Sequence, residues 1–138
     1  MNKIIKLLYR DYVKAYKYGE IPVSCVIVKN NKIIAHSYNK KNQKKIAIHH
    51  AEIDAIIKAS KKLKDWRLNE CEMYITLEPC NMCREVIKQS RIKKVFYFVS
   101  SNFNNENGTN TQYIKLENFP QLTEHNTNIL KQFFINKR

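Results

Sequence analysis

The chain has 138 residues, and its 25 Lys and Arg against 12 Asp and Glu give a formal net charge of +13 at pH 7. This length suits one compact core and excludes two separate ones, so we expect a single domain over 1–138. No apolar run approaches the roughly 18 residues that span a bilayer, and Met1–Lys6 lacks the apolar stretch of a secretory signal. We therefore expect a soluble, cytoplasmic protein.

The high positive charge favours a polyanionic partner, and nucleic acid is the first choice for so small a basic domain. The alternative is compositional drift toward Lys, Asn and Ile, which produces the same excess of positive charge without a partner.

The spacing of apolar residues predicts a series of alternating helices and strands. Apolar residues three and four positions apart indicate helices, and β-branched runs indicate strands. Gly19 is placed to end the first helix, Asn30-Asn31 is a hairpin turn, and Pro79 suits a helix start. In chain order we expect a helix over 2–18, strands over 22–28 and 32–38, an irregular polar stretch over 39–45, a helix over 50–63, a strand over 72–77, a helix over 80–90, a strand over 94–99, a loop over 100–111, a weak strand over 113–116 and a helix over 127–138.

This order of elements predicts an α/β layered domain with a mixed sheet, because its later strands are joined by helical crossovers.

Only two of the four cysteines form a recognisable pair. Cys80 and Cys83 make a C-x-x-C, which in an intracellular chain favours metal binding or catalysis over a disulfide. Cys25 lies in an apolar run, where a buried free thiol is expected, and Cys71 gives no signal. His36 and His125 lie far from this pair in sequence, and we interpret both as surface or loop histidines.

Two motifs stand at the starts of successive helices. His50-Ala-Glu52 is an H-x-E, and Pro79-Cys80-x-x-Cys83 is a P-C-x-x-C; together they are the signature of zinc nucleobase deaminases. Two thiolates on one helical turn can reach one ion, and His50 supplies a third ligand while a fourth position stays open for water. Helix N-termini favour thiolates, so we predict one Zn²⁺ per subunit, held by His50, Cys80 and Cys83.

Glu52 is the predicted catalytic residue, because it is well placed to shuttle protons between a zinc-activated water and the substrate. A zinc ribbon would need a second ligand pair, and a redox pair would leave His50 and Glu52 unexplained. A zinc-stabilised RNA-binding protein without turnover is a third hypothesis, but a structural site needs no such carboxylate beside an open position. His49 is interpreted as a polar residue preceding a ligand.

The sequence resembles the tRNA adenosine deaminase (TadA) family over nearly its whole length. The string Thr-Leu-Glu-Pro-Cys-Asn-Met-Cys over 76–83 is the most specific match. The weaker matches are Glu20-Ile-Pro-Val, Tyr38-Asn39, His50-Ala-Glu-Ile, Trp66-Arg-Leu, Ser90-Arg-Ile, and Phe133-Phe134 followed by Lys137-Arg138. The segments 45–49 and 101–110 depart from the family's usual pattern.

This resemblance implies a cytidine deaminase-like three-layer α/β/α fold with a mixed five-stranded sheet, and a homodimer. It implies hydrolytic conversion of the wobble adenosine of a tRNA anticodon to inosine. The alternative is a deaminase of a small substrate such as deoxycytidylate, cytidine or guanine.

The resemblance also assigns binding residues. Asn39, Pro22 and Glu78 would contact the target nucleoside, although Asn39 equally suits a turn at a strand end. Phe133, Phe134, Lys137 and Arg138 would bind the anticodon stem-loop. The alternative for Phe133 or Phe134 is packing on the core.

Overall fold

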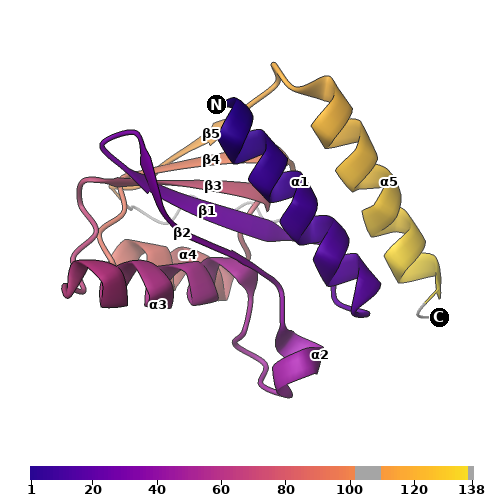
Figure 1. Ribbon diagram of the computed structural model, residues 1–138, viewed down its shortest axis with the longest axis horizontal. Coiled ribbons are helices and arrows are strands. Elements are labelled where there is room, and N and C mark those ends of the chain that lie inside the picture. The colour runs from indigo at the N-terminus through magenta and orange to yellow at the C-terminus, as the bar shows by residue number, and fades with distance from the viewer. Residues whose placement is uncertain (102–109, 137–138) are drawn as a thin grey trace.

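The computed structural model describes residues 1–101 and 110–136 and contains one mixed sheet with helices on both faces (Figure 1). The strands lie in the order β2-β1-β3-β4-β5; β1 is antiparallel to β2 and β3, whereas β3, β4 and β5 are parallel. The elements are α1 (Asn2–Lys17), β1 (Ser24–Lys29), β2 (Lys32–Tyr38), α2 (Lys41–Lys44), α3 (Ala51–Leu63), β3 (Cys71–Leu77), α4 (Asn81–Gln89), β4 (Lys94–Val99), β5 (Gln112–Lys115) and α5 (Pro120–Asn136).

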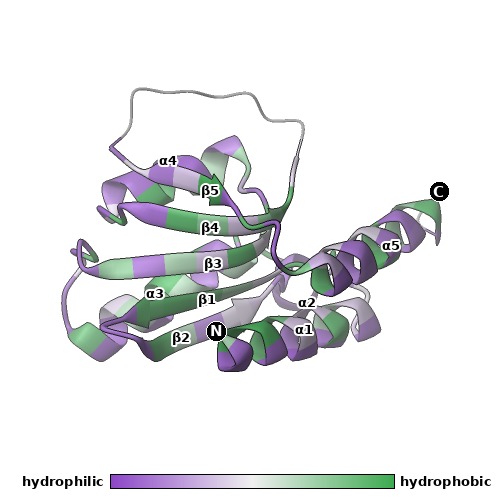
Figure 2. Ribbon diagram, turned by 90° about the horizontal axis from the view of Figure 1, so that it is seen from above, coloured by the Kyte–Doolittle hydropathy of each residue, from purple (hydrophilic) through white to green (hydrophobic). Residues whose placement is uncertain are grey.

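The sheet separates two hydrophobic clusters, because successive side chains of a strand point to opposite faces. Cys25 and Ile27 of β1 pack in the cluster that contains α3 and α4, and Val26 and Val28 pack with α1 and α5. Figure 1 shows α1 and α5 side by side on one face and α3 with α4 on the other. The helices of both layers alternate hydrophilic and hydrophobic residues (Figure 2). The predicted three-layer fold is confirmed.

Local turn signals were predicted well. Asn30 and Asn31 join β1 to β2 with φ of 50° and 63°, and two positive φ values match a type I′ hairpin turn. Gly19 follows α1 with φ of 75°, a conformation that costs glycine little.

Three predictions were wrong. The irregular stretch contains the short helix α2, whose N-terminal N–H groups are bonded by a distant carboxylate that local sequence does not reveal. The last helix starts at Pro120, seven residues before the predicted start at residue 127. The prediction missed these residues because the buried polar Asn126 interrupts the apolar stripe of the helix. His125 lies in this helix, partly buried, and its Nδ1 is 2.7 Å from the Tyr12 hydroxyl of α1.

The sheet edge where β3 and β4 end carries the functional motifs. From Leu77 the chain passes through Glu78 and Pro79 into α4, and the Glu78 N–H donates to the Val99 carbonyl at the end of β4. The described helices include none with the length and apolar character to cross a membrane.

Candidate metal centre and active site

Two predicted metal ligands occupy the N-cap positions of neighbouring helices. His50 caps α3 and Cys80 caps α4, both with extended backbone, and among the described residues neither cap has a side-chain hydrogen bond to the helix N–H groups. The positive ends of two helix dipoles therefore meet at one point, where they favour anionic ligands.

The third ligand lies one turn into α4, and the three ligand atoms converge. The Nδ1 of His50 is 3.8 Å from the Sγ of Cys80 and 3.4 Å from that of Cys83, and all three atoms lie within 4.8 Å of one another. A tetrahedral zinc with bonds of about 2.0 Å to N and 2.3 Å to S separates its ligand atoms by about 3.5 to 3.8 Å. The donor set and its spacing therefore fit zinc.

The pKa values of the two cysteine thiols are shifted in opposite directions. Hydrogen bonds from Cys83 and then His50 lower the pKa of Cys80 to about 4, whereas the hydrogen bond to Cys80 raises the pKa of Cys83. The hydrogen bond between His50 and Cys80 raises the pKa of His50. Because a metal must displace these protons, zinc affinity will fall as the pH falls.

Glu52 lies in the first turn of α3, and only 4% of it is exposed. Burial raises the pKa of Glu52, and hydrogen bonds from its own backbone N–H and the Cys83 thiol partly oppose that shift. A carboxyl whose pKa is raised toward neutrality is suited to both accepting and donating a proton.

A cavity of about 100 Å³ opens beside these groups. Asn39 contributes a buried side-chain oxygen that has no hydrogen-bond partner among the residues that the structure describes. A buried oxygen usually accepts a hydrogen bond, so this one is placed to accept a hydrogen bond from a bound substrate. The lining residues are Ile21, Val23, Asn39, His50, Ala51, Glu52, Leu77, Glu78 and Cys80.

The other two predicted substrate contacts have different surroundings. Glu78 lines the cavity, but Arg84 is bonded to one of its carboxylate oxygens and the Ser101 N–H to the other. Pro22 is buried and does not line the cavity, although its neighbours Ile21 and Val23 do, and its carbonyl accepts a hydrogen bond from Asn126 of α5.

His49 has a partner that the sequence analysis missed. Its Nδ1 is 2.6 Å from the Asp54 carboxylate, which lies in the first turn of α3. This pair joins the segment before His50 to the helix that His50 caps, and the only sequence signal for it is the five-residue spacing.

The predicted RNA-binding residues of α5 separate into two environments. Phe133 is 8% exposed and packs edge to face on Phe134, which is 52% exposed. The expectation that one of them packs on the core is therefore confirmed for Phe133. Lys137 and Arg138 lie outside the described residues.

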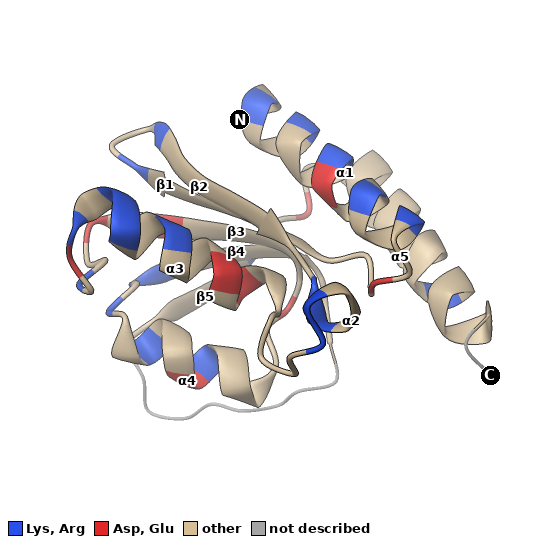
Figure 3. Ribbon diagram, turned by 60° about the horizontal axis from the view of Figure 1, so that its bottom comes forward, with Lys and Arg blue, Asp and Glu red and all other residues tan. Residues whose placement is uncertain are grey.

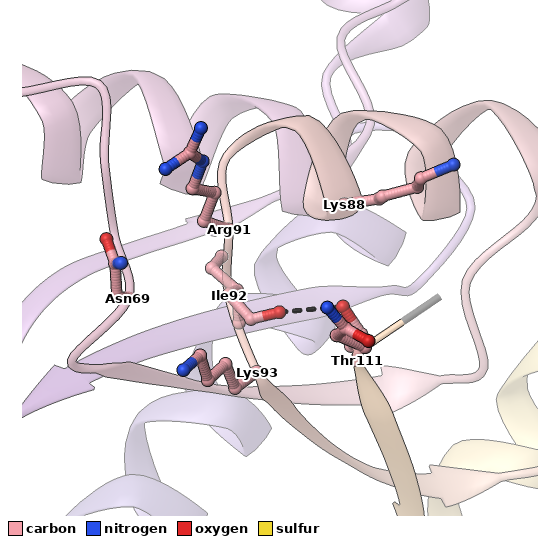
Figure 4. A pocket seen from close by; sticks show the side chains of 7 residues that line it. Asn69, Lys88, Arg91, Ile92, Lys93 and Thr111 are labelled. Atoms are coloured by element: carbon pink, nitrogen blue, oxygen red, sulfur yellow. Dashed lines mark hydrogen bonds between the residues drawn. The ribbon is translucent and has the colours of Figure 1, made fainter. Parts of the chain in front are cut away.

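A larger cavity, about 430 Å³, lies at the opposite end of α4 and is lined by Lys88, Arg91 and Lys93. Figure 4 shows the charged ends of Lys88 and Lys93 pointing in opposite directions and Arg91 pointing elsewhere, and Arg91 lies over the Trp66 ring. Because these cations do not converge, we assign no ligand to this cavity.

Comparison with known proteins identifies the same chemistry. Residues 1–99 match the family described as the cytidine and deoxycytidylate deaminase zinc-binding region. The tRNA-specific adenosine deaminase of Rickettsia typhi is 37% identical over 130 residues, which are 87% of this chain and 88% of that one.

Two solved structures are also similar. One, from work on A-to-I editing by tRNA:A34 deaminases, has a TM-score of 0.75 at 24% identity over 83% of this chain and 98% of that chain, which supports the fold. The guanine deaminase of Bacillus subtilis has a TM-score of 0.63 at 36% identity over 69% of this chain and 63% of that chain.

The fold and the three converging ligands therefore define a zinc-dependent deaminase. Within the cytidine and deoxycytidylate deaminase family, the chain belongs with the tRNA-specific adenosine deaminases.

The ligand geometry predicts one zinc per chain in the purified protein. Replacing Cys83 with Ala should weaken zinc binding by more than about 100-fold, since even the outer partners of metal ligands contribute about 10- to 100-fold. Titration with a competing chelator measures the affinity. Cys71→Ala, a buried cysteine outside the site, is the matched control, and equal zinc affinity in both variants would contradict the assigned ligand set.

Proposed function

We propose that this protein hydrolytically deaminates the wobble adenosine of a tRNA anticodon to inosine. The observation that carries the proposal is the shared cavity, which is lined by Glu52, by Asn39, whose side-chain oxygen has no partner within the described part of the chain, and by the ligands His50 and Cys80. A proton-transferring group, a substrate acceptor and a metal site therefore meet at one place.

The residues of the chain have separate roles in this mechanism. His50, Cys80 and Cys83 would hold zinc, which when bound supplies an activated water. Glu52 takes a proton from the attacking water and delivers it to the ring nitrogen beside the attacked carbon. It then takes the proton of the new hydroxyl and transfers it to the leaving amine, so that the C–N bond breaks, ammonia departs and the carbonyl of inosine forms. Asn39 accepts a hydrogen bond from the nucleoside, which fixes the ring against Glu52.

An RNA substrate accounts for features that a free base does not require. The +13 charge suits phosphates, and an RNA loop presents unstacked bases to a pocket. The relatives named tRNA-specific adenosine deaminases support the same substrate. A tRNA substrate also supports a cytoplasmic location.

A deaminase of a small substrate is the second candidate. The likeness to a guanine deaminase at 36% identity favours it, because that enzyme's name specifies a free base. Deoxycytidylate, cytidine and guanine are therefore the competing substrates to test.

The test is deamination of an anticodon stem-loop RNA with adenosine at the wobble position, compared with the three small substrates. We expect inosine in the RNA only. Glu52→Gln should lower kcat by about 10²- to 10⁴-fold, the usual contribution of general acid–base catalysis, while zinc stays bound.

The control is Glu85→Gln, because Glu85 is an exposed carboxylate on α4. Turnover of a small substrate alone would replace the tRNA proposal with the second candidate. Full activity in Glu52→Gln would eliminate the proposed proton shuttle.

We propose that the chain forms one deaminase domain in which α5 has a structural and an RNA-binding side. This is supported by β5 pairing with β4, and by Leu122 and Leu130 of α5 packing in the two core clusters. Phe133 faces the protein, whereas the exposed Phe134 is available to stack on a base.

Unfolding should therefore be one cooperative transition. Its free energy should depend on Phe133 and hardly on Phe134. Phe133→Ala should lower the free energy of unfolding by about 3–5 kcal/mol, and Phe134→Ala by less than about 0.5 kcal/mol. Phe134→Ala should instead weaken binding of the stem-loop RNA by about 1–3 kcal/mol, the value of base–aromatic stacking. Urea titration and fluorescence anisotropy measure the two effects, and unchanged RNA affinity in Phe134→Ala would remove it from the interface.

We also propose a homodimer formed through α3 and α4. Ile57 of α3 is 40% exposed and Met82 of α4 is 36% exposed, and the 54% exposed Trp66 lines a surface pocket together with residues of α3 and α4. Large exposed apolar residues that gather on one side of a domain often mark a protein interface.

The mass in solution should accordingly be twice the chain mass of 16.4 kDa. Ile57→Asp should convert the protein to a monomer, because a buried unpaired carboxylate opposes association. Ile135→Asp, at a 65% exposed position of α5, should leave the dimer intact. Light scattering distinguishes these results, and a wild-type monomer would refute the proposed dimer.

A further inference from the structure

Arg84 of α4 contacts the residues that lead from β3 into α4. Its Nη2 donates to the Glu78 carboxylate at 2.6 Å, and its Nε donates to the Pro79 carbonyl at 3.1 Å. Its guanidinium lies over the Tyr113 ring of β5, 4.0 Å from the ring centre. One side chain therefore contacts both Glu78 and Pro79 of the turn and connects them to β5.

The turn that Arg84 holds connects the sheet to the metal site. Glu78 lines the substrate cavity, and Cys80, two residues later, is both a cavity residue and a ligand. The other side of the Glu78 carboxylate accepts the Ser101 N–H at 3.0 Å. Glu78 is thus fixed between the segment that follows β4 and the first turns of α4.

The ion pair is largely removed from solvent, since the side chains of Arg84 and Glu78 are 14% and 13% exposed. At such a site the loss of one partner leaves the other charge uncompensated. Without Arg84, an uncompensated Glu78 carboxylate would line the substrate cavity, two residues before the zinc ligand Cys80.

Arginine suits this position better than lysine. Its planar fork presents several donors in fixed directions, and its flat face stacks on an aromatic ring. Lysine offers one compact ammonium, which keeps the charge but not the simultaneous contacts with Pro79, Glu78 and Tyr113.

We propose that Arg84 is a positioning residue that fixes the Glu78 wall of the substrate cavity and the Pro79–Cys80 turn that presents the zinc ligand Cys80. This inference rests on the proposed deaminase function and deepens it. Arg84 does not line the cavity, so it acts through Glu78 and Pro79.

The test compares Arg84→Gln with Lys88→Gln, which removes the same charge from an exposed position one turn later on α4. Arg84→Gln should release zinc to a chelator about 10- to 100-fold faster than wild type, as expected for an outer partner of a metal ligand. With zinc saturating, its KM for the stem-loop RNA should stay raised by about tenfold or more, because the cavity wall is displaced. Lys88→Gln should match the wild type in both measurements.

A double variant separates positioning from general stabilisation. Glu78→Gln removes the charge that Arg84 compensates, so Glu78→Gln/Arg84→Gln should lose less zinc retention than the product of the two single effects, by at least about threefold. If Arg84→Gln does not fold, Arg84→Lys replaces it in both comparisons and should still release zinc faster than Lys88→Gln, because a single ammonium cannot keep the contacts with Pro79, Glu78 and Tyr113 together.

Zinc release and KM like those of Lys88→Gln would overturn the proposal, and so would single effects that simply multiply. Failure of the proposed function gives a different result. In that case the wild type itself would not deaminate the RNA, while zinc release would still report on Arg84.

Discussion

The structure of the site depends on two helix N-termini meeting at one edge of the sheet. The residues at both N-caps, His50 and Cys80, have extended backbone and turn their side chains toward each other, so neither gives its helix a side-chain cap. A Ser, Asp or Asn cap at such a position contributes about 0.5–2 kcal/mol, and these helices forgo that contribution. A metal bound by the same side chains would join the helices instead and offset part of the loss.

A second constraint fixes the opposite wall of the cavity. The buried carboxylate of Glu20 accepts the N–H groups of Asn42 and Gln43, at 2.9 and 2.6 Å, and thereby holds α2 against the end of α1. The Lys40 N–H donates to the His49 carbonyl, and this bond links the segment after Asn39 to the one that leads into α3. The position of Asn39 therefore depends on contacts made on both sides of it.

The sequence was most informative where the determinants are local. Cys80 and Cys83 are one helical turn apart, so their proximity follows from helix geometry, and the Asn30-Asn31 turn similarly specifies its hairpin. His50, 30 positions before Cys80, was predicted as a ligand only because the H-x-E and P-C-x-x-C motifs occur together. What sequence could not show depends on tertiary contacts. Arg84 reaches Tyr113 across 29 positions, and α2 is capped by Glu20 from the end of α1. Neither contact leaves a periodic pattern in the chain.

The net charge understates how positive the surface is, because several acidic groups are turned inward. Cations remain outside, along α1, on α2 and near the ends of α3 and α4 (Figure 3). The largely buried carboxylates are Asp11, bonded to His36; Glu20, bonded to α2; Glu52 in the cavity; Asp54, bonded to His49; and Glu78, paired with Arg84. Each of them serves an internal contact or the cavity, so fewer carboxylates oppose the lysines outside than the composition suggests. A strongly cationic exterior around a small, largely apolar cavity suits a substrate whose phosphates stay on the surface while one base enters.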